Sequence, residues 1–376
     1  MSSPVTLVIF EGGATYSPLE ERFRQVRKAV VIDQVIKAQK AGLDNIVLCT
    51  PYTDLAEQAK DYGVTVELEE PDEGKFHLGK RLQSVVSRRN LAKVLYMGGA
   101  AAPLISANEL EYLRHLLTDH QGVVIANNYF SADIIGFTPG CTVDGLDLPA
   151  IDNSLPSVLV HQGELRFIPL QRSLGLQFDL DTPGDLLALA VHPRVGYHAK
   201  QALEAAAFDI SRCEQIKQVI GDPLAELVVF GRVGSLLFKY LDEGTRCRIR
   251  LYSEERGLKA LGRDVRQEGV SLFARLIESL GYGQFFQFLS EICQGAVLDT
   301  RIIFSHFNWN LSQSDRFYSD LGIVDEITHP GLRAFTQAAY NAPIPLMLGG
   351  HSLVTGGLWA LIEASYLEAH SKPRDV

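Results

Sequence analysis

Two aspartates separated by one apolar residue are the clearest candidates for metal chemistry in this sequence. In an extended segment, the carboxylates of Asp179 and Asp181 point to the same face. Thr182 follows them and can cap a helix that begins at Pro183 and has Asp185 in its first turn. Paired carboxylates at a strand end, beside a helix N-terminus, suit a divalent metal and a phosphate. The alternative is a capped helix start with solvated acids, and the spacing fits both.

The elements before this motif alternate between strands and helices. Short apolar runs predict the strands, and helical periodicity predicts the helices between them. The expected strands are 5–10, 45–49, 64–68, 93–97 and 123–126. The expected helices are 20–41, 53–62, 76–89 and 106–117. This alternation is typical of a doubly wound, mostly parallel α/β sheet, in which ligands sit beyond the carboxyl ends of the strands.

Glycine pairs follow two of these strands and fit phosphate-binding turns. Gly12-Gly13 comes soon after the first strand, and Gly98-Gly99 follows the fourth. Because glycine has no β-carbon, such turns let the backbone approach a phosphate closely. Arg22 and Lys28 come next in the chain and are expected to contact the same phosphate. We expect both glycine turns and the two aspartates to converge at one edge of the sheet.

The composition is that of an ordinary globular protein. Hydrophobic residues make up 46% of the chain, and 35 basic against 45 acidic side chains give a net charge of −10. This balance argues against general nucleic-acid binding. No apolar run reaches the roughly 18 residues that a membrane span needs, and the N-terminus has no basic leader. The five cysteines form no C-x-x-C pair, so we expect reduced thiols in a cytoplasmic protein.

The second half carries arginines on an expected strand. Helices are expected at 209–221, 223–241, 270–280 and 285–293. Arg246, Arg248 and Arg250 lie between the second and third of these helices, and strand alternation puts them on one face. Three arginines on one strand face are either a solvated, ion-paired edge or a binding site for a carboxylate or phosphate.

A glycine turn near the C-terminus suggests a second anion-binding helix start. Residues 344–348 read as a strand, Gly349-Gly350 as a turn, and Ser352 as the cap of a helix over 353–363. The sequence after His351 lacks the second glycine of G-x-S-x-G, so we exclude a serine hydrolase. A tight turn without a ligand is the alternative.

An anionic acceptor is the ligand that would bring these basic groups together. Residues 299–306 read as a strand that carries Arg301. Because arginines in an acidic protein converge mainly around acids or a bound anion, we predict one pocket lined by Arg248, Arg250 and His351. Arg301 and Ser352 are further candidates for binding this acceptor.

In order along the chain, the motifs of the first half resemble GT-A-type nucleotidyltransferases. Gly12-Gly13 resembles their nucleotide loop, and 33–47 resembles their first crossover. The segment 93–104 resembles the strand and Pro-Leu turn where that family holds its nucleotide and metal. Residues 178–186 resemble the D-x-D-T-P-x-D-L ending of the molybdenum-cofactor and phospholactate guanylyltransferase branches. The resemblance covers residues 1–195 and does not extend to the second half.

The sequence departs from that family at two places. The loop after Gly12-Gly13 has no basic residue in 14–19, so Arg22 or Lys28 would have to contact the phosphate. The family's aspartate after the fourth strand is replaced by glycines and alanines in 98–102. The resemblance then implies that Mg²⁺ rests on Asp179 and Asp181 or that metal binding is lost.

We therefore expect a two-domain protein that handles nucleotides. Residues 1–195 would form the nucleotide-binding domain, and 196–376 a largely helical α+β domain that binds the acceptor or caps the site. The expected reaction transfers a nucleotidyl group from an NTP to a phosphorylated or carboxylated small molecule, with Mg²⁺. One alternative is a non-catalytic nucleotide-binding or scaffold protein of the same fold, and another is a glycosyltransferase using a nucleotide-sugar. The base, the acceptor and the oligomeric state are not predicted.

Overall fold

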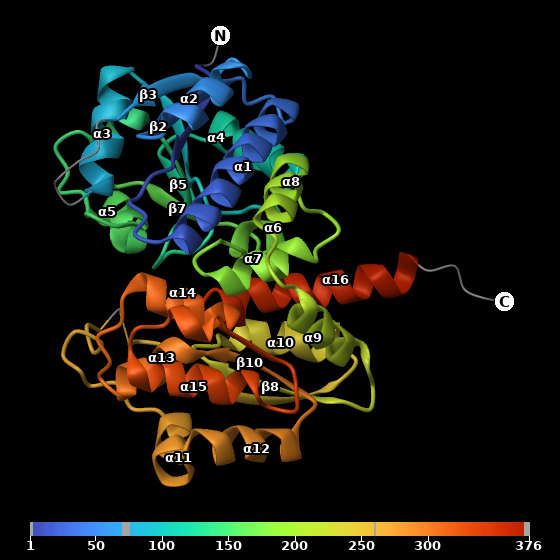
Figure 1. Ribbon diagram of the computed structural model, residues 1–376. Coiled ribbons are helices and arrows are strands. Elements are labelled where there is room, and N and C mark those ends of the chain that lie inside the picture. Colours follow the sequence, from blue (N-terminus) through green and yellow to red (C-terminus); the bar gives the residue numbers. More distant parts are fainter. Residues whose placement is uncertain (1–2, 70–75, 259–260, 372–376) are drawn as a thin grey trace. The chain divides into compact units, whose positions relative to one another are not determined.

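The computed structural model describes residues 3–69, 76–258 and 261–371 (Figure 1). Contacts within the chain divide it into two compact units. The first unit comprises Met1–Ala14, Gln25–Gln177 and Gly196–Ala199. The second unit comprises Thr15–Arg24, Phe178–Val195 and Lys200–Val376. The functional boundary expected at residue 195 stays a prediction.

The first unit is built on a seven-stranded sheet with the order β3-β2-β1-β4-β6-β5-β7. Only β6 runs antiparallel to its neighbours, so the sheet is mostly parallel, as predicted. Every residue of the central strand β1 is buried, as expected for a strand covered on both faces. The strands are β1 (Val5–Phe10), β2 (Asn45–Thr50), β3 (Thr65–Leu68), β4 (Lys93–Gly98), β5 (Val123–Ala126), β6 (Ile134–Thr138) and β7 (Arg166–Pro169).

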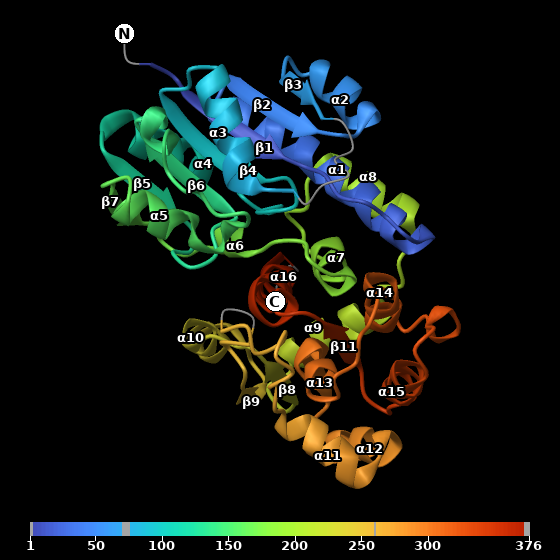
Figure 2. The ribbon, with the colours of Figure 1, turned by 90° about the vertical axis from the view of Figure 1, so that its left-hand side faces the viewer.

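Helices cover both faces of this sheet because alternate strand residues point to opposite sides. Leu7 and Ile9 of β1 pack in one apolar cluster with residues of α1, α2 and α4, whereas Val8 and Phe10 pack in the other with α3 and α5. Figure 2 shows the strands side by side between these helices. The helices are α1 (Pro18–Lys40), α2 (Thr53–Lys60), α3 (Leu78–Arg88), α4 (Ala107–Asp119), α5 (Leu155–His161) and α6 (Leu174–Gln177). The doubly wound fold class is confirmed.

The second unit contains a four-stranded sheet with the order β11-β10-β8-β9. All of its neighbouring strands are parallel. The strands are β8 (Glu226–Gly231), β9 (Arg248–Ser253), β10 (Gly295–Asp299) and β11 (Leu346–Gly349). This unit is rich in helices, as expected, and its helices alternate with the parallel strands.

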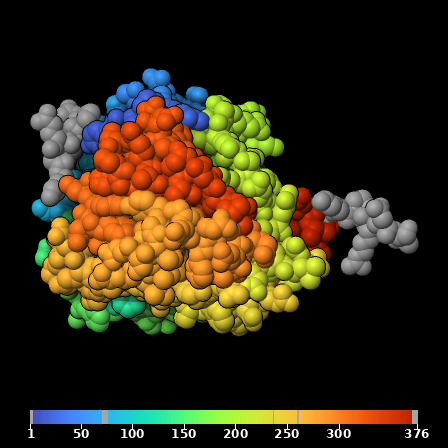
Figure 3. Space-filling model, turned by 60° about the horizontal axis from the view of Figure 1, so that its bottom comes forward, coloured from blue at the N-terminus to red at the C-terminus, as the bar shows by residue number. Residues whose placement is uncertain are grey.

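Helices also lie on both faces of the second sheet. Val228 and Phe230 of β8 join an apolar cluster with α11, α12, α13 and α15, and α9, α10 and α16 contact the strands or each other on the opposite side. The outer surface coloured gold to orange in Figure 3 includes α11 and α12. The helices are α7 (Pro183–Ala190), α8 (Tyr197–Ala206), α9 (Ser211–Gly221), α10 (Ser235–Gly244), α11 (Leu272–Leu280), α12 (Tyr282–Ile292), α13 (Thr300–His306), α14 (Gln313–Leu321), α15 (Pro330–Tyr340) and α16 (Leu358–Ser371).

Two element predictions in the second half were wrong. The helix expected over 223–241 is strand β8 followed by α10, because a short buried apolar run has the same hydrophobicity in a strand and in a buried helix. The strand expected over 299–306 is helix α13, which follows β10 and is capped by Asp299. Arg301 therefore lies in the first turn of a helix, directly beyond a strand end.

None of the described helices is long and apolar enough to cross a membrane.

Candidate functional site

The ends of β1 and β4 meet at the middle of the first sheet. The chain runs from β1 to β2 on one side, and β4 pairs with β1 on the other, so the strand order reverses between β1 and β4. The Gly99 amide donates a hydrogen bond of 2.8 Å to the Phe10 carbonyl oxygen and joins the two loops. Ligands of open α/β sheets bind at such a switch point. The predicted nucleotide turns, Gly12-Gly13 and Gly98-Gly99, therefore follow the two strands that border it.

A buried carboxylate occupies this junction. Glu11 follows β1 directly and is 2% exposed. Its Oε1 lies 3.1 Å from Nε of Arg27 on α1, and its Oε2 accepts a hydrogen bond of 3.1 Å from Nη2. Burial raises the pKa of Glu11, and the Arg27 guanidinium opposes that rise. Sequence reasoning missed Glu11, although an acid directly after a mostly apolar strand was an available signal.

The side chain of Glu11 explains why Gly99 must be glycine. A β-carbon on Gly99 would collide with the Glu11 carboxylate, so no side chain fits at this position. The family that the sequence resembles has an aspartate in this β4 loop, whereas residues 98–102 of this chain contain no acid. In the structure, the carboxylate at the junction comes from the end of β1 instead.

Lys28 is linked to the first glycine turn through Tyr52, and its contact with a phosphate stays a prediction. Its side chain is buried, and Nζ lies 2.6 Å from Oδ2 of Asp54 and 4.8 Å from the centre of the Tyr52 ring. The Tyr52 hydroxyl donates a hydrogen bond of 2.7 Å to the Gly13 carbonyl oxygen. A short chain of contacts thus joins the Lys28 ammonium to the Gly12-Gly13 turn.

Arg22 is engaged elsewhere, although it was predicted to bind the same phosphate. Its guanidinium donates a hydrogen bond to the Ala206 carbonyl oxygen and stacks 4.5 Å from the centre of the Phe208 ring. All three residues belong to the second unit. In the first unit, Arg27 and Lys28 supply the positive charge around the β1 loop.

The two predicted metal ligands belong to the second unit, just before α7. Asp179 is half-buried and Asp181 is exposed. Thr182 and Asp185 form the expected capping box, in which Asp185 Oδ2 accepts a hydrogen bond of 2.7 Å from the Thr182 amide. The helix start at Pro183 is thereby confirmed, and the use of Asp179 and Asp181 as ligands stays a prediction.

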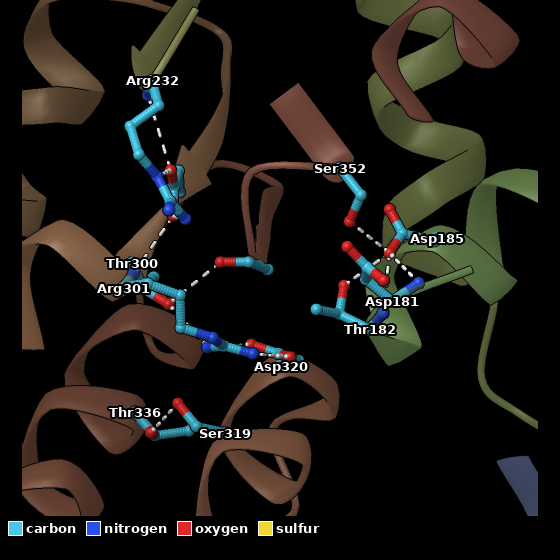
Figure 4. Close-up of polar contacts among 12 residues, drawn as sticks. Asp181, Thr182, Asp185, Arg232, Thr300, Arg301, Ser319, Asp320, Thr336 and Ser352 are labelled. Atoms are coloured by element: carbon cyan, nitrogen blue, oxygen red, sulfur yellow. Dashed lines mark hydrogen bonds and ion pairs between the residues drawn. The ribbon is translucent and has the colours of Figure 1, made fainter. Parts of the chain in front are cut away.

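Asp185 also holds the C-terminal glycine turn (Figure 4). The Ser352 hydroxyl donates a hydrogen bond of 2.6 Å to Asp185 Oδ2. Burial, followed by the charge of Asp181, raises the pKa of Asp185 to about 7. Ser352 was expected to cap the last helix, but its side chain caps no helix and bonds to α7 instead. The backbone continues as a π-helical turn over Leu353–Gly357 before α16.

We predict that Ser352→Ala lowers the free energy of unfolding by about 1–3 kcal/mol, because a buried carboxylate oxygen loses one of its donors. Chemical denaturation measured at neutral pH would test this. Thr355→Ala serves as the control, because among the described residues this hydroxyl bonds only to backbone carbonyls of its own turn. Equal losses of unfolding free energy for the two substitutions would show that the hydrogen bond to Asp185 stabilises the fold no more than an ordinary hydroxyl–backbone contact.

The structure does not bring the predicted acceptor-binding residues together. Arg248 and Arg250 lie in the first half of the edge strand β9, and Arg250 pairs with Glu226 of β8. His351 follows the end of β11, which is the opposite edge strand. Both arginines are exposed, and Arg250 is ion-paired. Arg301 alone of the predicted arginines lies at the carboxyl end of the sheet.

The described residues contain no group of three or more His, Cys, Asp or Glu side chains that could hold a metal ion. Mg²⁺ is commonly bound through one or two carboxylates together with substrate phosphates and water. The carboxylates of Asp179 and Asp181 match that donor chemistry. Two carboxylates do not make a cage of protein side chains, and their use as magnesium ligands stays a prediction.

Comparison with known proteins places the N-terminal part of the chain. No family model matches it. The phosphoenolpyruvate guanylyltransferase of Sphaerobacter thermophilus is 30% identical over 174 residues, which cover 44% of this chain and 80% of that protein. Through this part, the chain belongs to the nucleotidyltransferase family of that enzyme.

Solved structures of nucleotidyltransferases are also similar to this chain. A cytidylyltransferase from Leptospira borgpetersenii shares 16% identity, covers 55% of this chain and 93% of its own, and has a TM-score of 0.38. A CMP:2-keto-3-deoxy-manno-octonic acid synthetase complexed with CTP shares 14% identity, and the match covers 54% of this chain and 100% of that one with a TM-score of 0.37.

Proposed function

We propose that the protein transfers a nucleotidyl group from a nucleoside triphosphate to an anionic small molecule. The similarity to phosphoenolpyruvate guanylyltransferase carries this proposal. An oxygen of the acceptor's phosphate or carboxylate would attack the α-phosphorus. The bond between the α-phosphorus and the oxygen that leads to the β-phosphate would break, and pyrophosphate would leave. GTP and phosphoenolpyruvate are the first substrates to test because the related enzyme is named for them.

The β1–β4 junction supports this proposal with suitable groups for a triphosphate. Phosphoryl-type transfer depends on positioning and on neutralising charge rather than on a protein nucleophile. The Gly12-Gly13 and Gly98-Gly99 turns offer backbone that a phosphate can approach, and Lys28 offers a cation. Glu11 holds Arg27 at the same junction, so that guanidinium is oriented before the nucleotide arrives.

Asp179 and Asp181 are proposed to hold the magnesium ion. When bound, Mg²⁺ would neutralise phosphate charge and orient the triphosphate for displacement. The chain's own contribution is to keep the second carboxylate exposed at the start of α7. The capping box fixes that helix start, since both the Asp181 and Thr182 amides donate to Asp185.

The substitution Asp181→Asn is expected to weaken nucleotide binding in the presence of magnesium by about tenfold or more, because one anionic ligand is lost. The melting temperature should not change, because this side chain is exposed. Isothermal titration with GTP, with and without MgCl₂, measures the effect. Asp147→Asn, at another exposed aspartate, is the matched control. An unchanged magnesium dependence would limit Asp181 to the role of a solvated acid at a helix start.

The reaction itself is tested by pyrophosphate release. The purified protein is incubated with one of the four common NTPs, MgCl₂, and phosphoenolpyruvate or another phosphorylated carboxylic acid. We expect release only when nucleotide, acceptor and magnesium are all present. Nucleotide binding without release for any acceptor would instead favour the non-catalytic binding protein. Release of UDP or GDP from a nucleotide-sugar would favour the glycosyltransferase.

A further inference from the structure

Arginine–carboxylate pairs lie beyond the strand ends of the second sheet (Figure 4). The strand order of this sheet reverses between β8 and β10, because β9 follows β8 on one side and β10 joins it on the other. Arg232 follows β8, and its Nε and Nη2 donate hydrogen bonds of 2.7 and 3.1 Å to the Asp299 carboxylate at the end of β10. Both side chains are buried. This ion pair therefore lies at the switch point between β8 and β10.

A second arginine–carboxylate pair lies at the same carboxyl end of the sheet, beyond β10. Arg301, in the first turn of α13, forms a two-pronged ion pair with Asp320 of α14, and its Nη1 lies 2.9 Å from Oδ1. The same Nη1 donates a hydrogen bond of 3.0 Å to the Thr300 hydroxyl. A guanidinium has five N–H donors, and among the described residues these three bonds are the ones Arg301 makes. Two of its N–H groups are left for another acceptor.

Arg316 is the residue that these pairs leave without a carboxylate. It precedes Asp320 by four residues on α14, so both side chains lie on one face of the helix. Both oxygens of Asp320 are already bound by Arg301. Within the described parts of the chain, the Arg316 guanidinium makes no hydrogen bond or ion pair, although its side chain is half-buried. Burial lowers the pKa of Arg316, and the charge of Arg301 lowers it further.

Glu20 is the other acid near Arg316, and both of its carboxylate oxygens accept hydrogen bonds from other groups. One oxygen accepts a hydrogen bond of 2.5 Å from the Ser314 hydroxyl, and the other accepts one of 2.9 Å from the Tyr16 amide. Two neighbouring guanidinium groups therefore keep free donors at the carboxyl end of a parallel sheet. Burial lowers the pKa of Arg316, and the charges of Asp320 and Glu20 oppose that lowering without a described hydrogen bond to it, so its N–H donors are available to an oxyanion.

We propose that Arg316 and Arg301 together bind the phosphate group of a small molecule. A phosphate monoester fits better than a carboxylate because its three terminal oxygens can accept hydrogen bonds from both guanidinium groups at once. The packing of α14 fixes the backbone at this site, since the Ser319 hydroxyl forms a hydrogen bond of 2.7 Å with Thr336 of α15. Every residue of the site belongs to the second unit, so the inference stands without the proposed nucleotidyl transfer.

The test measures binding of inorganic phosphate to the full chain by phosphorus NMR line width, with acetate as a second ligand at matched ionic strength. Arg316→Gln is expected to weaken phosphate binding by about tenfold or more, because charge-assisted hydrogen bonds are lost. Its melting temperature without phosphate should equal that of the wild type. Arg250→Gln removes an exposed arginine of the same unit and should bind phosphate normally.

A variant of the first unit distinguishes phosphate bound at the nucleotide turns from phosphate bound at Arg316. Lys28→Met should keep the phosphate response that Arg316→Gln loses, which separates a failure here from a failure of the proposed function. Unchanged phosphate binding in Arg316→Gln would overturn the proposal. A response to acetate as strong as that to phosphate would also overturn it, and so would a large drop in the melting temperature of Arg316→Gln without phosphate. That last result would make Arg316 a structural partner of Glu20 and Asp320.

Discussion

Replacing Lys28 by methionine should lower kcat/KM for nucleotidyl transfer by about 10²- to 10³-fold, the range seen when one preorganised electrostatic contact to a transition state is removed. The Lys28 ammonium is joined to the Gly13 turn through Tyr52 and lies 2.6 Å from Asp54. Negative charge grows on the transferring phosphorus group and on pyrophosphate as the reaction proceeds. A fixed cation beside that turn therefore stabilises the transition state more than the ground state.

The fold should tolerate this change because methionine keeps most of the buried stem of the side chain. Asp54, the ion-pair partner, is 62% exposed and is solvated readily when the pair is lost. Lys40→Met changes the same charge on an exposed position of the same helix and should leave kcat/KM unchanged. A Lys28→Met enzyme that retains wild-type kcat/KM would remove Lys28 from the nucleotide site, and Arg27 would be the next cation to test.

The Arg232–Asp299 pair should give the largest change in stability. We expect Arg232→Ala to lower the free energy of unfolding by about 3–5 kcal/mol, the usual result of removing one partner of a buried ion pair. The substitution leaves the Asp299 carboxylate, which is fully buried, without its guanidinium. Asp299 also accepts a hydrogen bond of 3.3 Å from the Arg301 amide and starts α13, so it cannot simply move into solvent.

A double variant separates the lost contact from the stranded charge. Arg232→Met combined with Asp299→Asn removes both charges and should recover part of the stability, because no unpaired carboxylate is left buried. Arg250→Ala, at an arginine that is 44% exposed, should cost less than about 1 kcal/mol. Urea unfolding followed by circular dichroism measures all three. If Arg232→Ala lowered the free energy of unfolding no more than Arg250→Ala does, burial of the Arg232–Asp299 pair would not contribute to stability as expected.

Local patterns in the sequence were sufficient to predict five of the seven strands of the first sheet. Its strands are short apolar runs that are separated by helices of regular periodicity, and both signals are local. The glycine turns after β1 and β4 and the capping box at Thr182 are local as well, because a turn or a cap involves residues a few positions apart. These features, with the order of the family motifs, were sufficient for the doubly wound sheet and the start of α7.

Which charged side chains meet depends on the packing of elements that lie far apart in the sequence. The Glu11–Arg27 pair joins residues 16 positions apart, and Ser352 reaches Asp185 across 167. No local pattern predicts such contacts, because they depend on how helices pack on the sheets. Arg248 and Arg250 attracted attention by their spacing, yet that spacing only places them on one exposed strand face. Arg316 carried no sequence signal, because only the packing shows that Arg301, from another helix, is the arginine that pairs with Asp320.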